Sequence, residues 1–205
     1  NENLSSRLAQ LTWPLKFLDF ETVSTALPLY PAVEPWEQVV CQFSIHKLNE
    51  RGHLYHAEFL ANPEKECRRE LALRLLEELG TAGSVIVYSS FERVTLQTLA
   101  RLHPDLSEPL NNCIDRFVDL LAVIRTHYYQ PEFSGSFSIK RVLPAMLPEF
   151  SYDDLVIANG DAAITRFARM ARKEMLPTEI KQAQEELLAY CQRDTFAMVL
   201  LLNRL

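Results

Sequence analysis

The 205-residue chain has little of what marks a membrane or secreted protein. Its longest apolar runs, such as residues 198–202, are far shorter than the ~20 apolar residues that a helix needs to span a bilayer. No signal peptide is visible, and internal repeats and low-complexity tracts are also missing. We therefore expect a folded protein with no membrane partner.

Cysteine is scarce, and its spacing excludes the common thiol motifs. The four cysteines are Cys41, Cys67, Cys113 and Cys191, and no two of them form a C-x-x-C pair. A chain of this length can bury enough core to fold without disulfide crosslinks. We interpret the four side chains as reduced thiols and expect a cytoplasmic location.

Positive charge is in deficit, with 21 lysines and arginines against 27 aspartates and glutamates and a formal net charge of −6. This balance disfavours a protein that coats nucleic acid non-specifically, since such binding needs basic surface. It does not exclude a nuclease, because a carboxylate cluster filled with cations is less negative than its formal count.

The residue pattern predicts a single α/β domain over residues 1–205, and the start at Asn1 rather than Met predicts a longer protein with a further domain upstream. Expected strands cover residues 15–21, 38–48, 53–60 and 84–88, and expected helices cover 63–79, 91–102, 161–173 and 178–205. Prolines make 22–36 a loop, 117–124 is ambiguous between helix and strand, and 136–146 reads as a short helix interrupted by Pro144. This order predicts three layers around a mixed sheet, in which antiparallel strands come first and a parallel strand follows through a crossover helix.

Two carboxylates fall inside the first expected strand. Asp19 and Glu21 are two positions apart, so their side chains share one face of the strand. Two carboxylates desolvated together are costly unless a cation lies between them. A divalent ion such as Mg²⁺ or Mn²⁺, which prefers oxygen ligands, supplies that cation. The alternative is a strand end where both groups are solvated.

A third carboxylate interrupts the apolar stripe of the last expected helix. Helical spacing places Leu187, Tyr190, Asp194, Ala197 and Leu201 on one face. Asp194 therefore lies among apolar and aromatic residues, one turn after Tyr190. The alternatives are a simple Tyr–Asp hydrogen bond, or a surface ion pair between Asp194 and its neighbour Arg193.

A fourth candidate, Glu92, follows the expected strand 84–88 at the sheet end where α/β folds usually place ligands. The sequence Ser89-x-x-Glu92 also matches a capping box, in which Glu92 would satisfy only backbone N–H groups at the start of the helix. The sequence leaves both interpretations open.

Taken in order, these motifs resemble the ribonuclease H-like exonuclease superfamily named for four acidic residues, Asp-Glu-Asp-Asp. The resemblance is to its tyrosine subclass, whose last motif, Y-x-x-x-D, here reads Tyr190-Cys-Gln-Arg-Asp194. The histidine subclass needs H-x-x-x-x-D, and Ala189 occupies that histidine position. The phrases FLDFET, VYSSFE, GSFSIKRVLP and YCQRDT also resemble an uncharacterised bacterial domain family assigned to this fold.

The resemblance implies a 3′→5′ exonuclease that hydrolyses single-stranded DNA or RNA with two divalent ions. Asp19 would bridge both ions, Glu21 and Asp194 would complete the first site, and Glu92 would support the second. Tyr190 would orient the attacking water. The superfamily usually has aspartate where Glu92 stands, so Asp119, in an R-F-V-D-L-L segment, is the alternative fourth acid; otherwise Asp119 pairs with Arg116 or Arg125.

Contacts to the nucleic acid are predicted near the same motifs. Lys140, close to an expected helix start, is the candidate for phosphate binding, and Phe20 and Phe91 are candidates for stacking on a terminal base. Each phenylalanine has a core position as its alternative. Two other functions fit the sequence: a nuclease-like binding module without activity, and a phosphodiesterase of very short oligonucleotides.

Overall fold

A computed structural model of the chain describes residues 2–152, 154–157 and 159–205. The strands are β1 (Leu15–Val23), β2 (Val39–Leu48), β3 (Leu54–Leu60), β4 (Val85–Val87) and β5 (Phe117–Asp119). The α-helices are α1 (Glu2–Leu8), α2 (Arg68–Leu79), α3 (Phe91–Leu102), α4 (Ser107–Ile114), α5 (Leu120–His127), α6 (Ile139–Met146), α7 (Gly160–Ala171) and α8 (Pro177–Arg204). Two short 3₁₀ helices are η1 (Pro104–Leu106) and η2 (Pro131–Phe133).

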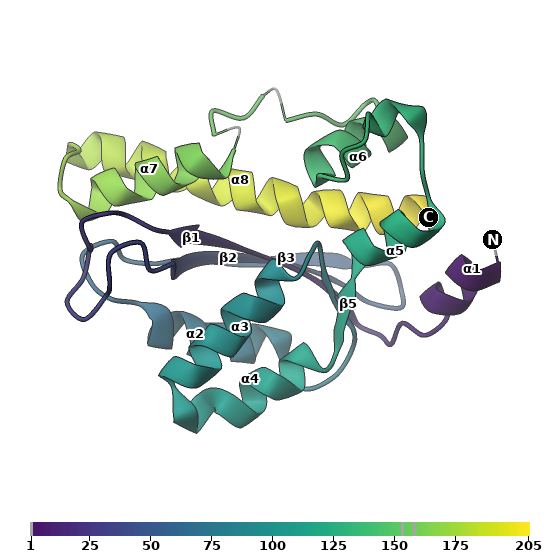
Figure 1. The fold of residues 1–205 in the computed structure, drawn as a ribbon, viewed down its shortest axis with the longest axis horizontal. Coiled ribbons are helices and arrows are strands. Elements are labelled where there is room, and N and C mark those ends of the chain that lie inside the picture. Colours follow the sequence, from purple (N-terminus) through teal and green to yellow (C-terminus); the bar gives the residue numbers. More distant parts are fainter. Residues whose placement is uncertain (1, 153, 158) are drawn as a thin grey trace.

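The five strands form one mixed sheet in the order β3-β2-β1-β4-β5. The pairs β1–β2 and β2–β3 are antiparallel, whereas β1–β4 and β4–β5 are parallel. Helices α2, α3 and α4 cover one face of the sheet, and α6, α7 and α8 lie over the other (Figure 1). The prediction of a three-layer α/β arrangement with the antiparallel strands first is therefore confirmed.

Strand β1 is central because apolar side chains leave it on both faces. Phe17 packs under α8, while Leu18 and Phe20 pack towards α2 and α3. All three are at most 3% exposed. A strand buried on both faces carries apolar residues at both odd and even positions. The sequence of residues 15–21 has this pattern.

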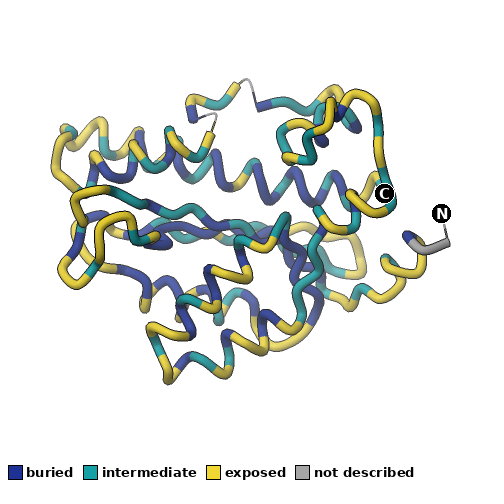
Figure 2. Tube along the Cα trace, in the orientation of Figure 1, coloured by how far each residue is buried: buried dark blue, intermediate teal, exposed yellow. Residues whose placement is uncertain are grey.

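The face of the sheet below α8 carries two apolar clusters rather than one. The first contains Leu15, Phe17 and Ile86 with residues of α5, α6 and the end of α8. The second contains Val23 with residues of α7 and the start of α8. Helix α8 spans both clusters, and a buried stripe follows its length (Figure 2). Between the clusters, β1 and α8 present polar side chains to each other.

Some expectations on the elements were wrong. Helix α2 begins at Arg68 rather than at residue 63, and α6 continues through Pro144 without interruption. The ambiguous segment 117–124 contains both alternatives, since β5 ends at Asp119 and α5 begins at the next residue. The short helix α4 was not expected, because its proline and asparagines are typical of a loop; the proline lies in the first turn, where a helix tolerates it.

None of the described helices combines the length and the sustained hydrophobicity that a bilayer-spanning segment requires.

Candidate active site

The candidate site is the polar gap between the two apolar clusters under α8. Along the α8-facing side of β1, Phe17 belongs to one cluster and Val23 to the other. Asp19 and Glu21 lie between them on the same face, as the sequence predicted, and both side chains are half-buried. The interpretation of a solvated strand end is wrong, because α8 packs over this part of the strand.

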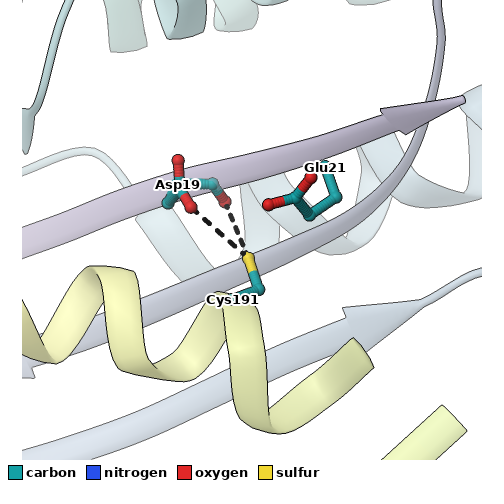
Figure 3. A group of neighbouring side chains, drawn as sticks. All are labelled: Asp19, Glu21 and Cys191. Atoms are coloured by element: carbon teal, nitrogen blue, oxygen red, sulfur yellow. Dashed lines mark hydrogen bonds between the residues drawn. The ribbon is translucent and has the colours of Figure 1, made fainter. Parts of the chain in front are cut away.

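Helix α8 contributes a tyrosine, a cysteine and an aspartate to the gap. Tyr190 and Asp194 are 4% and 8% exposed, so the predicted stripe is confirmed as a buried face of the helix. Cys191 is completely buried, and its Sγ lies 3.7 Å from Asp19 Oδ2 and 3.8 Å from the Asp19 backbone oxygen (Figure 3). The ligand atoms of Asp19, Glu21 and Cys191 all lie within 4.8 Å of one another.

Glu92 joins the same cluster from the start of α3. The helix begins at Phe91 with Ser90 as its N-cap, and the Ser90 side chain makes no capping hydrogen bond. Ser89 therefore lies outside the helix, and the capping box expected as the alternative is not formed. Instead Glu92 is 3% exposed, and a hydrogen bond with Asp19 contributes to its pKa.

Asp119 lies close to Glu92, but its side chain caps the N-terminus of α5. Its Oδ1 accepts a hydrogen bond from the Ala122 backbone N–H at 3.0 Å, which caps α5. The expected pair with Arg116 is wrong, because that guanidinium donates to the carbonyl oxygens of Ala82 and Gly83. The negative charge of Asp119 nevertheless raises the pKa of Glu92.

Burial and mutual repulsion favour the protonated forms of these carboxyl groups. Burial, and then the charge of Asp194, raise the pKa of Glu21 to about 8. Burial, followed by Asp119, raises the pKa of Glu92 to about 7. The pKa of Asp19 is raised well above its usual value by burial and by Asp194, Glu21 and Glu92. At neutral pH the cluster therefore binds either protons or an added cation.

Lys140, the second residue of α6, is a cation that faces the cluster. Its Nζ donates to Tyr190 Oη at 2.7 Å and lies 4.5 Å from the centre of the Tyr190 ring. Its charge also lowers the pKa values of Glu21 and Asp194, against the larger effect of burial. The structure thus brings Lys140 to the predicted site, while phosphate binding by it stays a prediction.

Asp194 is held by groups other than its sequence neighbour. Tyr152 donates from its Oη to Asp194 Oδ1 at 2.7 Å, and a hydrogen bond from Tyr190 also lowers the pKa of Asp194. Arg193 instead forms a bidentate pair with Asp154, at 2.7 and 3.0 Å. The alternative of a surface pair between Asp194 and Arg193 is therefore wrong.

Sequence reasoning missed Tyr152 and Cys191. Tyr152 lies in an irregular segment between α6 and α7, where no periodicity indicates which way a side chain points. Cys191 stands inside the Y-x-x-x-D motif itself, and helical spacing from Tyr190 and Asp194 would have placed it on the same side of α8.

The two predicted stacking residues belong to the apolar layers. Phe20 is 3% exposed and packs in the core below the sheet, on the face opposite Asp19, so the prediction that it stacks on a base is wrong. Successive residues of a strand point to opposite faces, which accounts for this position. Phe91 is half-buried and packs against the same core.

The donor set fits a divalent cation of the magnesium or manganese class. Four carboxyl groups from β1, α3 and α8 converge, and they offer hard oxygen ligands at a place where their own charges repel. Asp19, Glu21 and Asp194 are the residues that would hold a first ion, and Glu92 is the acid available for a second.

Comparison with known proteins identifies a family but no activity. Residues 16–138 match the family described as "Domain of unknown function (DUF2779)". The matched part contains Asp19, Glu21 and Glu92, whereas Tyr190 and Asp194 lie beyond it. A curated relative, "Uncharacterized protein UU173" of Ureaplasma parvum serovar 3 (strain ATCC 700970), is 26% identical in an alignment that covers 89% of this chain. The match spans 30% of that relative's length. No solved structure matches the chain.

Proposed function

The chain belongs to the DUF2779 family, and we propose that it is a metal-dependent 3′→5′ exonuclease with a ribonuclease H-like fold. The observation that carries the proposal is the convergence of Asp19, Glu21, Glu92 and Asp194, from three separate elements, in one buried cluster. Four carboxylates desolvated together lower the stability of a fold unless bound cations neutralise their charges. Their burial is therefore best explained by a cation site.

The fold part of the proposal is supported by the strand arrangement. Three antiparallel strands precede two parallel ones, and helices cover both faces. The acids lie on the central strand, after the neighbouring parallel strand and on the last helix, in the order along the chain that the resemblance implies.

When bound, two divalent ions would stabilise the attacking and the leaving oxygen of this reaction and lower the pKa of a bound water. Asp19 contacts both Glu92 and the α8 side of the cluster, so in this proposal it would help to hold both ions. Tyr152 holds Asp194 in place through its hydroxyl. These contacts fix the carboxylates before substrate arrives, which reduces the reorganisation that the reaction needs.

Tyr190 and Lys140 act as a pair in this proposal. The Lys140 ammonium donates to Tyr190 Oη and thereby leaves the Tyr190 hydroxyl hydrogen for another acceptor, such as Asp194, an attacking water or a phosphate oxygen. Burial, followed by the charges of Asp194 and Glu21, raises the pKa of Tyr190, so Tyr190 works as a hydrogen-bond donor rather than as a base. Lys140 is close enough to contact a phosphate that occupies the cluster.

A nuclease-like binding module without activity is the main competing function. The glutamate at position 92 favoured it, because aspartate is usual there. Its burial beside Asp19 now weakens that argument, since the longer side chain still reaches the cluster.

Degradation of 5′-labelled oligonucleotides of graded length, with Mg²⁺ or Mn²⁺, tests the proposal. We expect progressive shortening from the 3′ end of single-stranded DNA or RNA, and no cleavage of a circular single strand. Asp161→Asn, which changes an exposed acid on α7, is the matched control for Asp19→Asn. Shortening confined to the shortest substrates favours a phosphodiesterase of short oligonucleotides. No cleavage by a protein that still binds metal and nucleic acid favours the inactive module.

A further inference from the structure

Cys191 introduces a sulfur donor into a site whose other candidate ligands are oxygens. Its Sγ faces Asp19 and Glu21 from α8, and the carboxylate of Glu21 points into the same space (Figure 3). The thiol donates a weak hydrogen bond to Asp19. Thiolate is a soft ligand that selects zinc and similar ions, whereas magnesium is bound by oxygen.

The separation of the donor atoms suits an ion held between them. Zinc lies about 2.3 Å from a thiolate sulfur and about 2.0–2.2 Å from a carboxylate oxygen. Two such ligands at a tetrahedral angle are roughly 3.5–3.7 Å apart. Cys191 Sγ and Asp19 Oδ2 are 3.7 Å apart, so an ion can join them with little movement of either side chain.

A buried amide oxygen without a hydrogen-bond partner in the described part of the chain belongs to the residue paired with Glu21 in the sheet. Gln42 is fully buried, and its Nε2 donates to the Leu187 carbonyl oxygen at 2.9 Å. Its Oε1 has no hydrogen-bond partner among the residues that the structure describes. An unsatisfied buried acceptor costs about 1–3 kcal/mol.

The place of this amide is fixed from two sides. In the β1–β2 register Gln42 lies directly opposite Glu21. The Leu187 carbonyl is also the one to which the Cys191 N–H points in an α-helix, four residues on. Gln42 therefore lies beside Glu21 and under the turn of α8 that precedes Cys191, and its Oε1 is buried next to the proposed ligands.

From these observations we propose that Cys191, with Asp19 and Glu21, forms a metal position that prefers a thiophilic divalent ion of the zinc or cobalt class to magnesium. The proposal rests on the proposed function only in placing an ion at Asp19. On binding, the Cys191 S–H bond breaks, its proton passes to solvent, and the sulfur electron pair forms the bond to the metal. No electron is transferred.

Cobalt is the probe of choice, because Co²⁺ bound to thiolate absorbs in the near ultraviolet through charge transfer and Co²⁺ bound to oxygen alone does not. The full chain, freed of metal with a chelator, is titrated with CoCl₂ and followed by absorbance and calorimetry. We expect the charge-transfer band in the wild type and in Cys113→Ser, a matched change of another buried cysteine that lies on the opposite face of the sheet. A large excess of MgCl₂ should not remove the band.

The variant Cys191→Ser should lose the band and bind Co²⁺ on the order of 100-fold more weakly, at least as much as the loss of an outer-shell partner costs, while its Mn²⁺ affinity changes less. If Cys191→Ser fails to fold, persistence of the band in Cys41→Ala, Cys67→Ala and Cys113→Ala still assigns it to Cys191. Calorimetric binding of Co²⁺ without a band, or a band that survives in folded Cys191→Ser, overturns this inference alone. Failure of the wild type to bind Co²⁺, Mn²⁺ or Mg²⁺ overturns both this inference and the proposed function.

Discussion

Replacing Glu21 with glutamine should stabilise the metal-free protein at alkaline pH, although it removes a proposed ligand. Burial and the charge of Asp194 raise the pKa of Glu21 from 4.5 to about 8. In the unfolded chain the group loses its proton near its ordinary pKa, whereas the folded protein retains the proton up to about pH 8. The folded state therefore binds more protons in this range, and the free energy of unfolding falls as pH rises towards 8.

The loss of unfolding free energy can be calculated from the pKa shift of Glu21. At about 1.36 kcal/mol per pKa unit, the full difference corresponds to roughly 5 kcal/mol. Partial solvent contact and the sharing of protons with Asp194 reduce this to on the order of 2–3 kcal/mol. Glutamine carries no charge, so Glu21→Gln should unfold with a free energy larger by about that amount near pH 8.5 and almost unchanged near pH 5.

Urea unfolding in the presence of a chelator, followed by circular dichroism between about pH 7 and 8.5, measures this. His46 and His56 do not disturb this measurement. Burial lowers their pKa values below the ordinary 6.5, so their contribution to the pH dependence of stability falls mainly below pH 7. Added Mn²⁺ should stabilise the wild type and remove most of its pH dependence, but should stabilise Glu21→Gln much less. Lys16 and Glu92, whose pKa values of about 8 and about 7 lie in or near the same window, contribute to the slope of both proteins. Equal slopes in the two proteins would therefore refute the reasoning.

Substitutions at four further positions separate the roles within the site. Asp194→Asn should nearly abolish turnover, whereas Tyr190→Phe, which keeps the ring but loses the hydroxyl, should lower it by up to about 10²–10⁴-fold; full activity of Tyr190→Phe at saturating metal would remove the main support for the Y-x-x-x-D assignment. Glu92→Gln should cut turnover strongly while the protein melts at an equal or higher temperature, and Glu92→Asp should keep some activity; a silent Glu92→Gln would move the fourth-acid role to Asp119. Tyr152→Phe should weaken Mn²⁺ binding by on the order of 10–100-fold in a calorimetric titration, as outer-shell losses do, with an unchanged affinity counting against a positioning role.

Much of the fold could be predicted from the sequence, because its strongest signals are local. The helix over Phe91–Leu102 was expected with the bounds that the structure has, since its apolar periodicity is regular and His103-Pro104 ends it. The antiparallel pair β2–β3 followed from two strand patterns joined by a turn with Gly52. The strand β5 is only three residues long, which is too short for any period to appear.

Site residues in regular strands and helices could be predicted, because sequence spacing there determines which way a side chain points. Residues in irregular segments could not. Asp19 and Glu21 share a face because a strand alternates, and Tyr190 and Asp194 share one because a helix turns every 3.6 residues. Tyr152 reaches Asp194 from an irregular segment 42 residues away in the sequence, and only tertiary structure determines such a contact. The capping box expected at Ser89 failed because the helix begins one residue later than that motif requires.

Calorimetric titration of the chelator-treated chain with Mn²⁺, in parallel with Asp19→Asn, tests the central claim most directly. The charges of the other three acids act on Asp19, and its side chain accepts a hydrogen bond from the thiol of Cys191, so the claim that this cluster is a cation site depends on it more than on any other residue discussed. The account predicts Mn²⁺ binding with release of protons by the wild type, retained in Asp161→Asn and lost or reduced by orders of magnitude in a folded Asp19→Asn. Equal Mn²⁺ affinity in the wild type and Asp19→Asn would contradict it.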